Sequence, residues 1–176
     1  MSARMRELMF AVVGVAIGAV SMTFVHAQGA KFEGKLSHIG FAVRDVNKAA
    51  KEWADLFGVE VPKTMEVRDV PYGEGLAKKM SVRLVHLNVG GVTLELLQGF
   101  SPESLWAEHI AKHGETFNHF AFTVPDIAQA RDLLVKGGGK VWMNLTPLNY
   151  YVNLEPKYPM MIEISQPPPA AAGAAR

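Results

Sequence analysis

Two histidines and two glutamates of this chain stand in duplicated sequence contexts. His38 lies in SHIGFAVRDV, and His119 lies 81 residues further on in the similar stretch NHFAFTVPDI. Glu95 and Glu163, in VTLELLQ and MMIEISQ, are 68 residues apart. Both glutamates have apolar neighbours, and a buried carboxylate without a partner is strongly destabilising. The duplicated pattern therefore predicts one metal site with His38, Glu95, His119 and Glu163 as ligands.

This donor set indicates the kind of metal and the kind of chemistry. Two imidazoles and two carboxylates suit a single divalent ion such as Zn, Ni, Co, Mn or Fe, and the identity stays open. Four ligands leave room in an octahedral shell for a substrate with neighbouring oxygens. Such a metal acts as a Lewis acid while a carboxylate removes a proton from the adjacent carbon. We expect Glu163 or Glu95 to be that base, and the sequence does not say which.

The elements that must position these residues also repeat. Alternating segments at 36–43 and 117–124 predict strands that carry the two histidines. Asp45 and Asp126 stand at N-cap positions before predicted helices at 46–57 and 127–136. Each copy continues with three segments of strand character, at 59–67, 80–89 and 92–98 in the first and 140–144, 148–154 and 160–166 in the second. The turn-forming stretch 70–75 is expected to be a loop that could serve as a lid over the site.

This order predicts an α+β fold of two tandem βαβββ modules that form a cupped mixed sheet around one metal site. Strand alternation places His38 on the face that it shares with Gly40 and Ala42. His119 shares its face with Ala121 and Thr123. Because these neighbours are small, we expect free space beside both imidazoles.

The ends of the chain differ in composition from its centre. Arg4 and Arg6 precede an apolar run at 8–20, and Ala27 ends a small-x-small motif, so residues 1–27 are predicted to be a signal peptide or, alternatively, an uncleaved membrane anchor. A cleaved signal peptide predicts a secreted or periplasmic protein, and an uncleaved anchor predicts a membrane-anchored protein whose folded part faces outside. Residues 35–166 are expected to form one domain, made of module 35–98, connector 99–116 and module 117–166. The Pro- and Ala-rich segment 167–176 is predicted to be a disordered tail.

The overall composition excludes several classes of function. The net charge is +1, from 18 Lys and Arg against 17 Asp and Glu, and no basic stripe is interleaved with aromatic residues, so nucleic acid is not an expected partner. The chain has no cysteine, which rules out disulfides and thiolate metal ligands. We expect a small-molecule substrate, with membrane contact only through the N-terminal segment.

With these residues in place, the stretch from Lys35 to Pro167 resembles the vicinal oxygen chelate superfamily, which includes glyoxalases, bleomycin-resistance proteins and extradiol dioxygenases. The resemblance implies paired βαβββ modules, one metal per cup and frequent homodimers. Residues 101–122 are similar to the approach to the second module in methylmalonyl-CoA epimerases. All four metal positions are filled, which favours a glyoxalase- or epimerase-like enzyme, a lyase or isomerase acting on a small α-oxygenated carbonyl compound. Expected export argues against coenzyme A thioesters and glutathione adducts, so the resemblance does not identify the substrate.

Two alternatives remain open at this stage. An extradiol-type Fe(II) dioxygenase resembles the pattern at His38, His119 and Glu163, but it has no carboxylate at the position of Glu95. A small-molecule-binding or resistance protein of this superfamily usually lacks the ligands. Among the other histidines, His86 has no counterpart in the repeat and is interpreted as structural. His109 and His113 are interpreted as a solvated helix face because no third ligand is in view.

Overall fold

The structure, a computed structural model, describes residues 31–101 and 103–168, which form a mixed β-sheet and helices. The predicted signal peptide lies outside these residues, as do residues 169–176 of the predicted tail. The elements within the described residues are, in chain order, β1 (Lys35–Ala42), α2 (Val46–Phe57), β2 (Met65–Tyr72), the 3-10 helix η1 (Glu74–Leu76), β3 (Lys78–Val89), β4 (Val92–Gly99), α3 (Leu105–His113), β5 (Thr116–Thr123), α4 (Ile127–Lys136), β6 (Lys140–Thr146), β7 (Asn149–Asn153) and β8 (Met161–Ser165). Over this part of the chain, none of the helices has the length and apolarity needed to cross a membrane.

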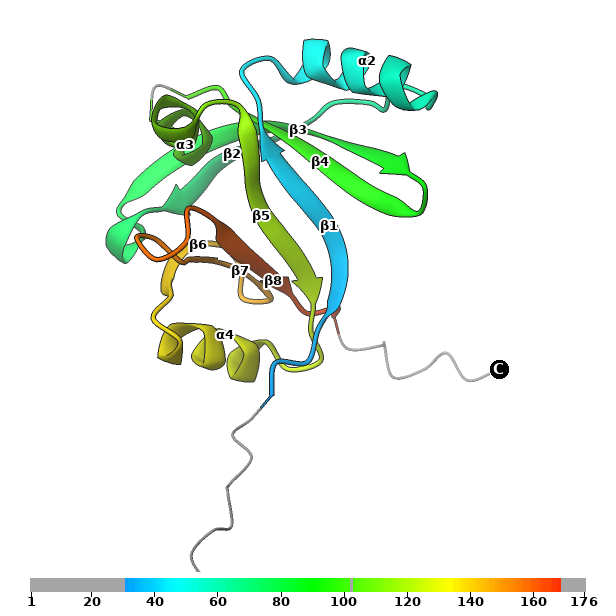
Figure 1. Cartoon of the computed structure of the whole chain (residues 1–176). Coiled ribbons are helices and arrows are strands. Elements are labelled where there is room, and N and C mark those ends of the chain that lie inside the picture. Colours follow the sequence, from blue (N-terminus) through cyan, green and yellow to red (C-terminus); the bar gives the residue numbers. More distant parts are fainter. Residues whose placement is uncertain (1–30, 102, 169–176) are drawn as a thin grey trace, which may run out of the picture. The chain divides into compact units, whose positions relative to one another are not determined.

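The order strand, helix and three strands occurs twice, once from β1 to β4 and once from β5 to β8, with α3 between the two copies (Figure 1). In each copy the first and last strands pair in parallel, β1 with β4 and β5 with β8. The other neighbours pair antiparallel. The predicted α+β class with two tandem βαβββ modules in a mixed sheet is therefore confirmed.

The curl of the sheet is complete. Its strand order, β1-β4-β3-β2-β6-β7-β8-β5, closes into a barrel where a cup was expected. One seam between the copies is the long antiparallel pairing of β1 with β5. The other seam is short and joins Tyr72 of β2 to Met143 of β6. Because closure leaves no free edge, both modules contribute strands to one continuous interior.

The two long helices begin and end where the sequence predicts. The Asp45 carboxylate accepts from the backbone N–H groups of Asn47 and Lys48, and Asp126 accepts from that of Gln129. Gly58 ends α2 in the left-handed conformation, with a φ of 68°. Caps depend on residues a few positions apart, so these boundaries are readable from local sequence.

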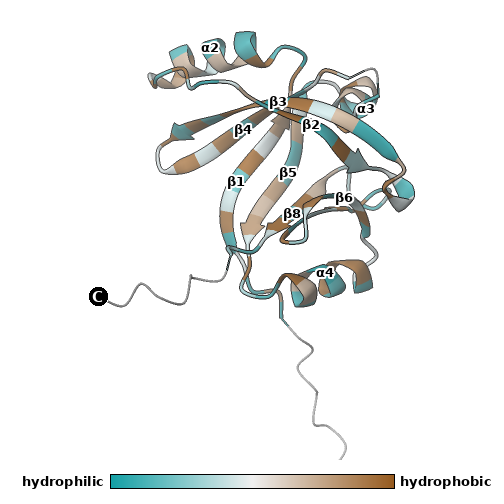
Figure 2. Ribbon diagram, turned by 180° about the vertical axis from the view of Figure 1, so that it is seen from behind, coloured by the Kyte–Doolittle hydropathy of each residue, from teal (hydrophilic) through white to brown (hydrophobic). Residues whose placement is uncertain are grey.

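Strand alternation separates the barrel interior from the faces that the helices cover. Val46, Ala50 and Ala54 of α2 pack on Val85, Leu87 and Leu96, and α4 packs in the same way on β6, β7 and β8. Figure 2 shows apolar and polar segments alternating along both helices, as expected for helices that bury one face. The opposite faces of the strands point inward, where a third cluster, including Tyr72, Met80, Leu97, Met143 and Tyr151, fills part of the barrel.

The segment between α2 and β3 differs from the prediction. The strand expected at 59–67 starts at Met65 and continues to Tyr72, through residues that were expected to form a loop. A bulge between Val67 and Val70, with Asp69 at a φ of 56°, allows the strand to continue. Val70 and Tyr72 are buried inside the barrel, 4% and 0% exposed. Burial of these two side chains therefore outweighs the local turn preference of the segment.

Candidate metal centre

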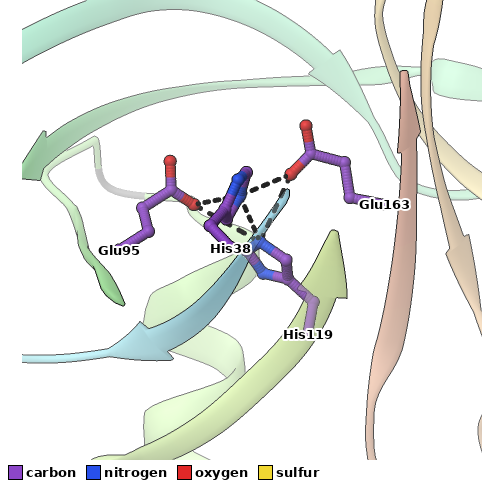
Figure 3. Close-up of side chains that lie close together, drawn as sticks. All are labelled: His38, Glu95, His119 and Glu163. Carbon is purple, nitrogen blue, oxygen red and sulfur yellow. Dashed lines mark hydrogen bonds and ion pairs between the residues drawn. The ribbon is translucent and has the colours of Figure 1, made fainter. Parts of the chain in front are cut away.

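The structure brings the four predicted residues together in the barrel interior. His38 lies on β1, Glu95 on β4, His119 on β5 and Glu163 on β8, so the four adjacent strands β4, β1, β5 and β8 each contribute one side chain. One donor atom from each residue lies within 4.8 Å of all the others. Figure 3 shows the four side chains pointing toward a common centre. The four residues that the repeat predicts to lie close together do so in the structure. Their role as metal ligands stays a prediction.

The donor atoms are closely spaced. Nε2 of His38 lies 3.3 Å from Oε2 of Glu95 and 3.0 Å from Oε2 of Glu163. Nε2 of His119 lies 3.3 Å from each of the same two oxygens. The two Nε2 atoms are 3.3 Å apart. One ion with bonds of about 2.1 Å to nitrogen and oxygen holds ligand atoms up to about 4.2 Å apart. The observed separations fit around such an ion.

The cluster is almost completely removed from solvent. Glu95, His119 and Glu163 are 4%, 0% and 6% exposed, and the His38 side chain is 13% exposed. Among the described residues, Oε2 of Glu95 and Oε2 of Glu163 have no hydrogen-bond partner. These two oxygens face the imidazole nitrogens of His38 and His119, and buried carboxylates are costly unless positive charge lies beside them. The donor chemistry and the orphaned oxygens are both consistent with one metal site.

The pKa values of His38, Glu95 and Glu163 are shifted in the directions that favour charged imidazole and carboxylate groups. Burial lowers the pKa of His38, but Glu163 and Glu95 outweigh that effect and raise it from 6.5 to about 10. Burial raises the pKa of Glu163, but His119 and His38 outweigh it and lower the pKa to about 2. The pKa of Glu95 is held well below its ordinary value, because His119, His38 and His86 outweigh the effect of burial. Protonated imidazoles therefore balance the carboxylates here, and a metal cation can take over that role.

The small residues beside the histidines were expected to leave free space, but they make room for side chains of the other module. Gly40 of β1 is the pairing partner of His119, and Ala121 of β5 is the partner of His38. A Cβ atom added at Gly40 would overlap the His119 ring. The space that the sequence predicts beside each imidazole is therefore occupied, at least at Gly40, by the imidazole of the other module. The small residues allow the two rings to approach each other across the seam.

His86 is a member of this site that sequence reasoning misses. Its Nε2 lies 2.9 Å from Oε1 of Glu95, and it is the antiparallel partner of that residue. The sequence does contain a signal for this contact. Gly90 and Gly91 form a two-residue turn with positive φ at both positions. Such a turn fixes the register of the hairpin and places residue 86 opposite residue 95. The interpretation of His86 as merely structural does not account for this contact.

In the second module, Glu163 has different neighbours from those of Glu95 in the first. Asn149 donates a hydrogen bond from Nδ2 to Oε1 of Glu163 at 2.6 Å. Tyr151 pairs with Glu163 as His86 pairs with Glu95, and its ring centroid lies 5.1 Å from that of His119. Burial, followed by the charges of Glu163 and Glu95, raises the pKa of Tyr151 well above 10. This hydroxyl is therefore neutral at physiological pH.

The remaining histidine pair lies on α3. Nε2 of His113 is 3.0 Å from Oε1 of Glu155, and His109 is half-buried beside it. Neither belongs to the cluster of His38, Glu95, His119 and Glu163, which is the only metal-type cluster found in the described residues. Although Glu155 lies beside His113, the two histidines and this carboxylate are not among the metal-type clusters found in the described residues.

Comparison with known proteins agrees with this architecture. Residues 37–147 match the sequence profile described as the glyoxalase/bleomycin resistance protein/dioxygenase superfamily. No curated protein matches the sequence significantly. Among solved structures, the chain is similar to a hypothetical protein from Bacillus halodurans, with a TM-score of 0.56, 23% identity, and 79% of this chain and 98% of that chain covered.

Two further structures share the fold at low identity. A methylmalonyl-CoA epimerase from Mycobacterium tuberculosis has a TM-score of 0.53 and 17% identity over 82% of this chain and 95% of that chain. A mutant 4-hydroxymandelate synthase from Streptomyces coelicolor has a TM-score of 0.53 and 20% identity over 81% of this chain and 42% of that chain. The profile match spans more than half of the sequence. The chain therefore belongs to the glyoxalase/bleomycin resistance protein/dioxygenase superfamily, which is the vicinal oxygen chelate superfamily that its repeated motifs resemble.

Proposed function

We propose that this protein is a metal-dependent enzyme that moves a proton on a small α-oxygenated carbonyl substrate, as a lyase, isomerase or epimerase does. The convergence of two imidazole nitrogens and two orphaned carboxylate oxygens within 4.8 Å is the observation that carries the proposal. Non-catalytic binding requires no such arrangement. Glu95 lies in the cluster, which supports a four-ligand set over the three-ligand set of an extradiol dioxygenase.

The proposed ligands are His38, Glu95, His119 and Glu163, and the metal is one of Zn, Ni, Co, Mn or Fe. When bound, the ion supplies Lewis-acid stabilisation of the negative charge that develops on a substrate oxygen. The burial of the cluster strengthens this effect, because water that would screen the charge is largely excluded. His38, the most exposed of the four residues, marks the side from which a substrate would approach.

A glutamate of the cluster would remove the proton. Each carboxylate is held by one oxygen, Glu95 through His86 and Glu163 through Asn149. The other oxygen of each faces the centre. A carboxylate that loosens from the metal could use this inner oxygen to accept a proton from a substrate carbon or return one to it. This arrangement supports either Glu95 or Glu163 as the base.

The proposed substrate class is a small molecule with neighbouring oxygens. One structure of the same fold is a methylmalonyl-CoA epimerase in complex with methylmalonyl-CoA, with a TM-score of 0.50 and 21% identity. We propose the same type of proton transfer for this chain without the coenzyme A moiety, because residues 1–27 have the pattern of an export signal. Sequencing the N-terminus of the protein from isolated cell fractions tests export. A homodimer is a further proposal, and the solution mass tests it.

Metal analysis of the purified protein is the first test of the function. Stoichiometric Zn, Ni, Co or Mn is the expected result. Oxygen-labile Fe(II) would favour the dioxygenase alternative. A site that stays empty after incubation with each of these metals would exclude both enzymes.

Solvent exchange tests the chemistry directly. The metal-loaded protein is incubated in D₂O with a panel of small 2-hydroxy and 2-oxo carbonyl compounds, and proton NMR follows the loss of the α-proton signal. Exchange by the native protein is expected for at least one compound. The variants Glu95→Gln and Glu163→Gln are the matched controls, and exchange that persists in both would contradict a cluster glutamate as the base.

A further inference from the structure

Two bulges interrupt the seam between β1 and β5. On β1 the register shifts between Leu36 and His38, which leaves Ser37 as the extra residue. On β5 the partners of Gly40 and Phe41 are His119 and Phe117, which leaves Asn118 as the extra residue. Each bulge thus falls on the residue immediately before a cluster histidine. The same positions, 81 residues apart, correspond in the sequence repeat.

These bulges change which side chains can meet. In a regular strand, adjacent side chains point to opposite faces, so residue i cannot reach the ring of residue i+1. A bulge removes that restriction by re-aiming the extra residue. Oγ of Ser37 lies 3.3 Å from Nδ1 of His38, and Oδ1 of Asn118 lies 3.1 Å from Nδ1 of His119. Both contacts are made to the ring nitrogen that faces away from the metal centre.

The two contacts differ in environment. Asn118 and His119 are both completely buried, so water does not compete with their hydrogen bond. Ser37 is exposed and its contact is longer. Oδ1 of Asn118 faces the His119 ring, whereas Nδ2 has no partner among the described residues, and Asn118 lines a pocket of about 170 Å³ together with His109 and Trp142.

We propose that Asn118 is the positioning residue for His119. The inference rests on the proposed metal site. Oδ1 of Asn118 accepts a hydrogen bond from Nδ1–H of His119, which fixes the ring and leaves the lone pair of Nε2 directed at the metal. Ser37 makes the weaker equivalent contact to His38. The module with Asn118 therefore supplies the fixed imidazole, and the module with Ser37 supplies the more adjustable one.

Two variants of similar shape separate positioning from packing. Asn118→Leu fills the same volume without an acceptor, whereas Asn118→Asp keeps the acceptor. Loss of an outer-shell partner typically lowers metal affinity by about 10- to 100-fold. We expect that loss in Asn118→Leu and an affinity within about threefold of wild type in Asn118→Asp. Competition of zinc between the protein and a chelator measures the affinities.

A spectroscopic measurement complements the affinities. In the zinc-loaded, ¹⁵N-labelled wild type and Asn118→Asp, the Nδ1–H of His119 should give a slowly exchanging NMR signal, and Asn118→Leu should lose it. Equal zinc affinity and an unchanged signal in Asn118→Leu would overturn the positioning role while leaving the proposed function intact. Equal losses in the Leu and Asp variants would also overturn it, because they indicate packing alone. A wild type that binds no metal would contradict the proposed function itself and, with it, the inference.

Discussion

At the scale of single residues, Glu95 separates the proposed proton-transfer enzyme from the dioxygenase alternative. It is one of two buried carboxylates whose inner oxygens lie 3.3 Å or less from both imidazole nitrogens. As the proposed fourth ligand, it would leave fewer positions for substrate and dioxygen than a three-ligand iron site does. Its contact with His86 sets it apart from Glu163, which is held by a neutral amide. The two carboxylates are therefore equivalent in the repeat but not in their surroundings.

Replacing Glu95 by Gln tests its role. The variant keeps the shape of the side chain but removes the charge that pairs with the metal, so the affinity for zinc should fall by more than the roughly 10- to 100-fold typical of outer-shell changes. The far-UV circular dichroism spectrum should stay that of the wild type. Competition with a chelator gives the affinity, and an unchanged value would mean that Glu95 is not a ligand and would favour the dioxygenase pattern.

At the scale of elements, the seam between β1 and β5 determines how closely the two modules approach. Gly40 and Ala121 face His119 and His38 across this seam. A larger residue at either place would push the strands apart or turn the opposite ring. The φ of Gly40 is not in the left-handed region, so the requirement for glycine there is steric and comes from the ring of the other module.

The variant Gly40→Ala should therefore disturb the metal centre from the opposite strand. Overpacking of this kind costs about 1–3 kcal/mol of folding free energy, and the displaced His119 ring should also weaken zinc binding. Urea unfolding and zinc titration measure the two effects. Ala121→Gly is the matched control, since it removes a methyl group beside His38 and is expected to retain zinc binding. Wild-type affinity in Gly40→Ala would show that the seam has room to relax.

At the scale of the whole molecule, the cluster of His38, Glu95, His119 and Glu163 draws on both halves of the barrel. Two of these proposed ligands come from strands of the first copy and two from the second, while β2 and β6 pair through a single residue pair. A metal at the centre would therefore hold the modules together as well as serve in catalysis. Because these ligands converge only in the folded chain, metal binding should stabilise the native state.

Removal of the metal should lower the melting temperature. With free zinc at 100 times its Kd, binding to the native state alone adds about 2.7 kcal/mol, which corresponds to a rise in Tm of roughly 5–12 °C for a domain of this size. Calorimetry with zinc and with a chelator measures the difference. The Glu95→Gln variant should show a much smaller shift. Equal melting temperatures of the zinc-loaded and metal-free wild type would contradict a site that links the modules.

The amino-acid sequence by itself determined the features that depend on local or duplicated signals. Capping residues set both ends of α2, and the repeat identified His38, Glu95, His119 and Glu163 because a duplicated module places its corresponding residues in corresponding positions. Strand alternation correctly gave the shared interior face of these side chains. Only four positions of the site carry this duplicated signal.

The tertiary structure alone decided what depends on contacts between distant strands. Barrel closure, the burial of Val70 and Tyr72 in β2, and the fit of Gly40 against His119 all arise from packing across the modules. Of the partners of the cluster, His86 is placed by a hairpin turn that the sequence contains, whereas Asn118 and Asn149 are placed by strand register and by bulges, and a shift of one residue would turn each of them to the other face. Register depends on how two strands pair. The sequence therefore predicts the four residues of the cluster, but it does not predict all of the residues that hydrogen-bond to them.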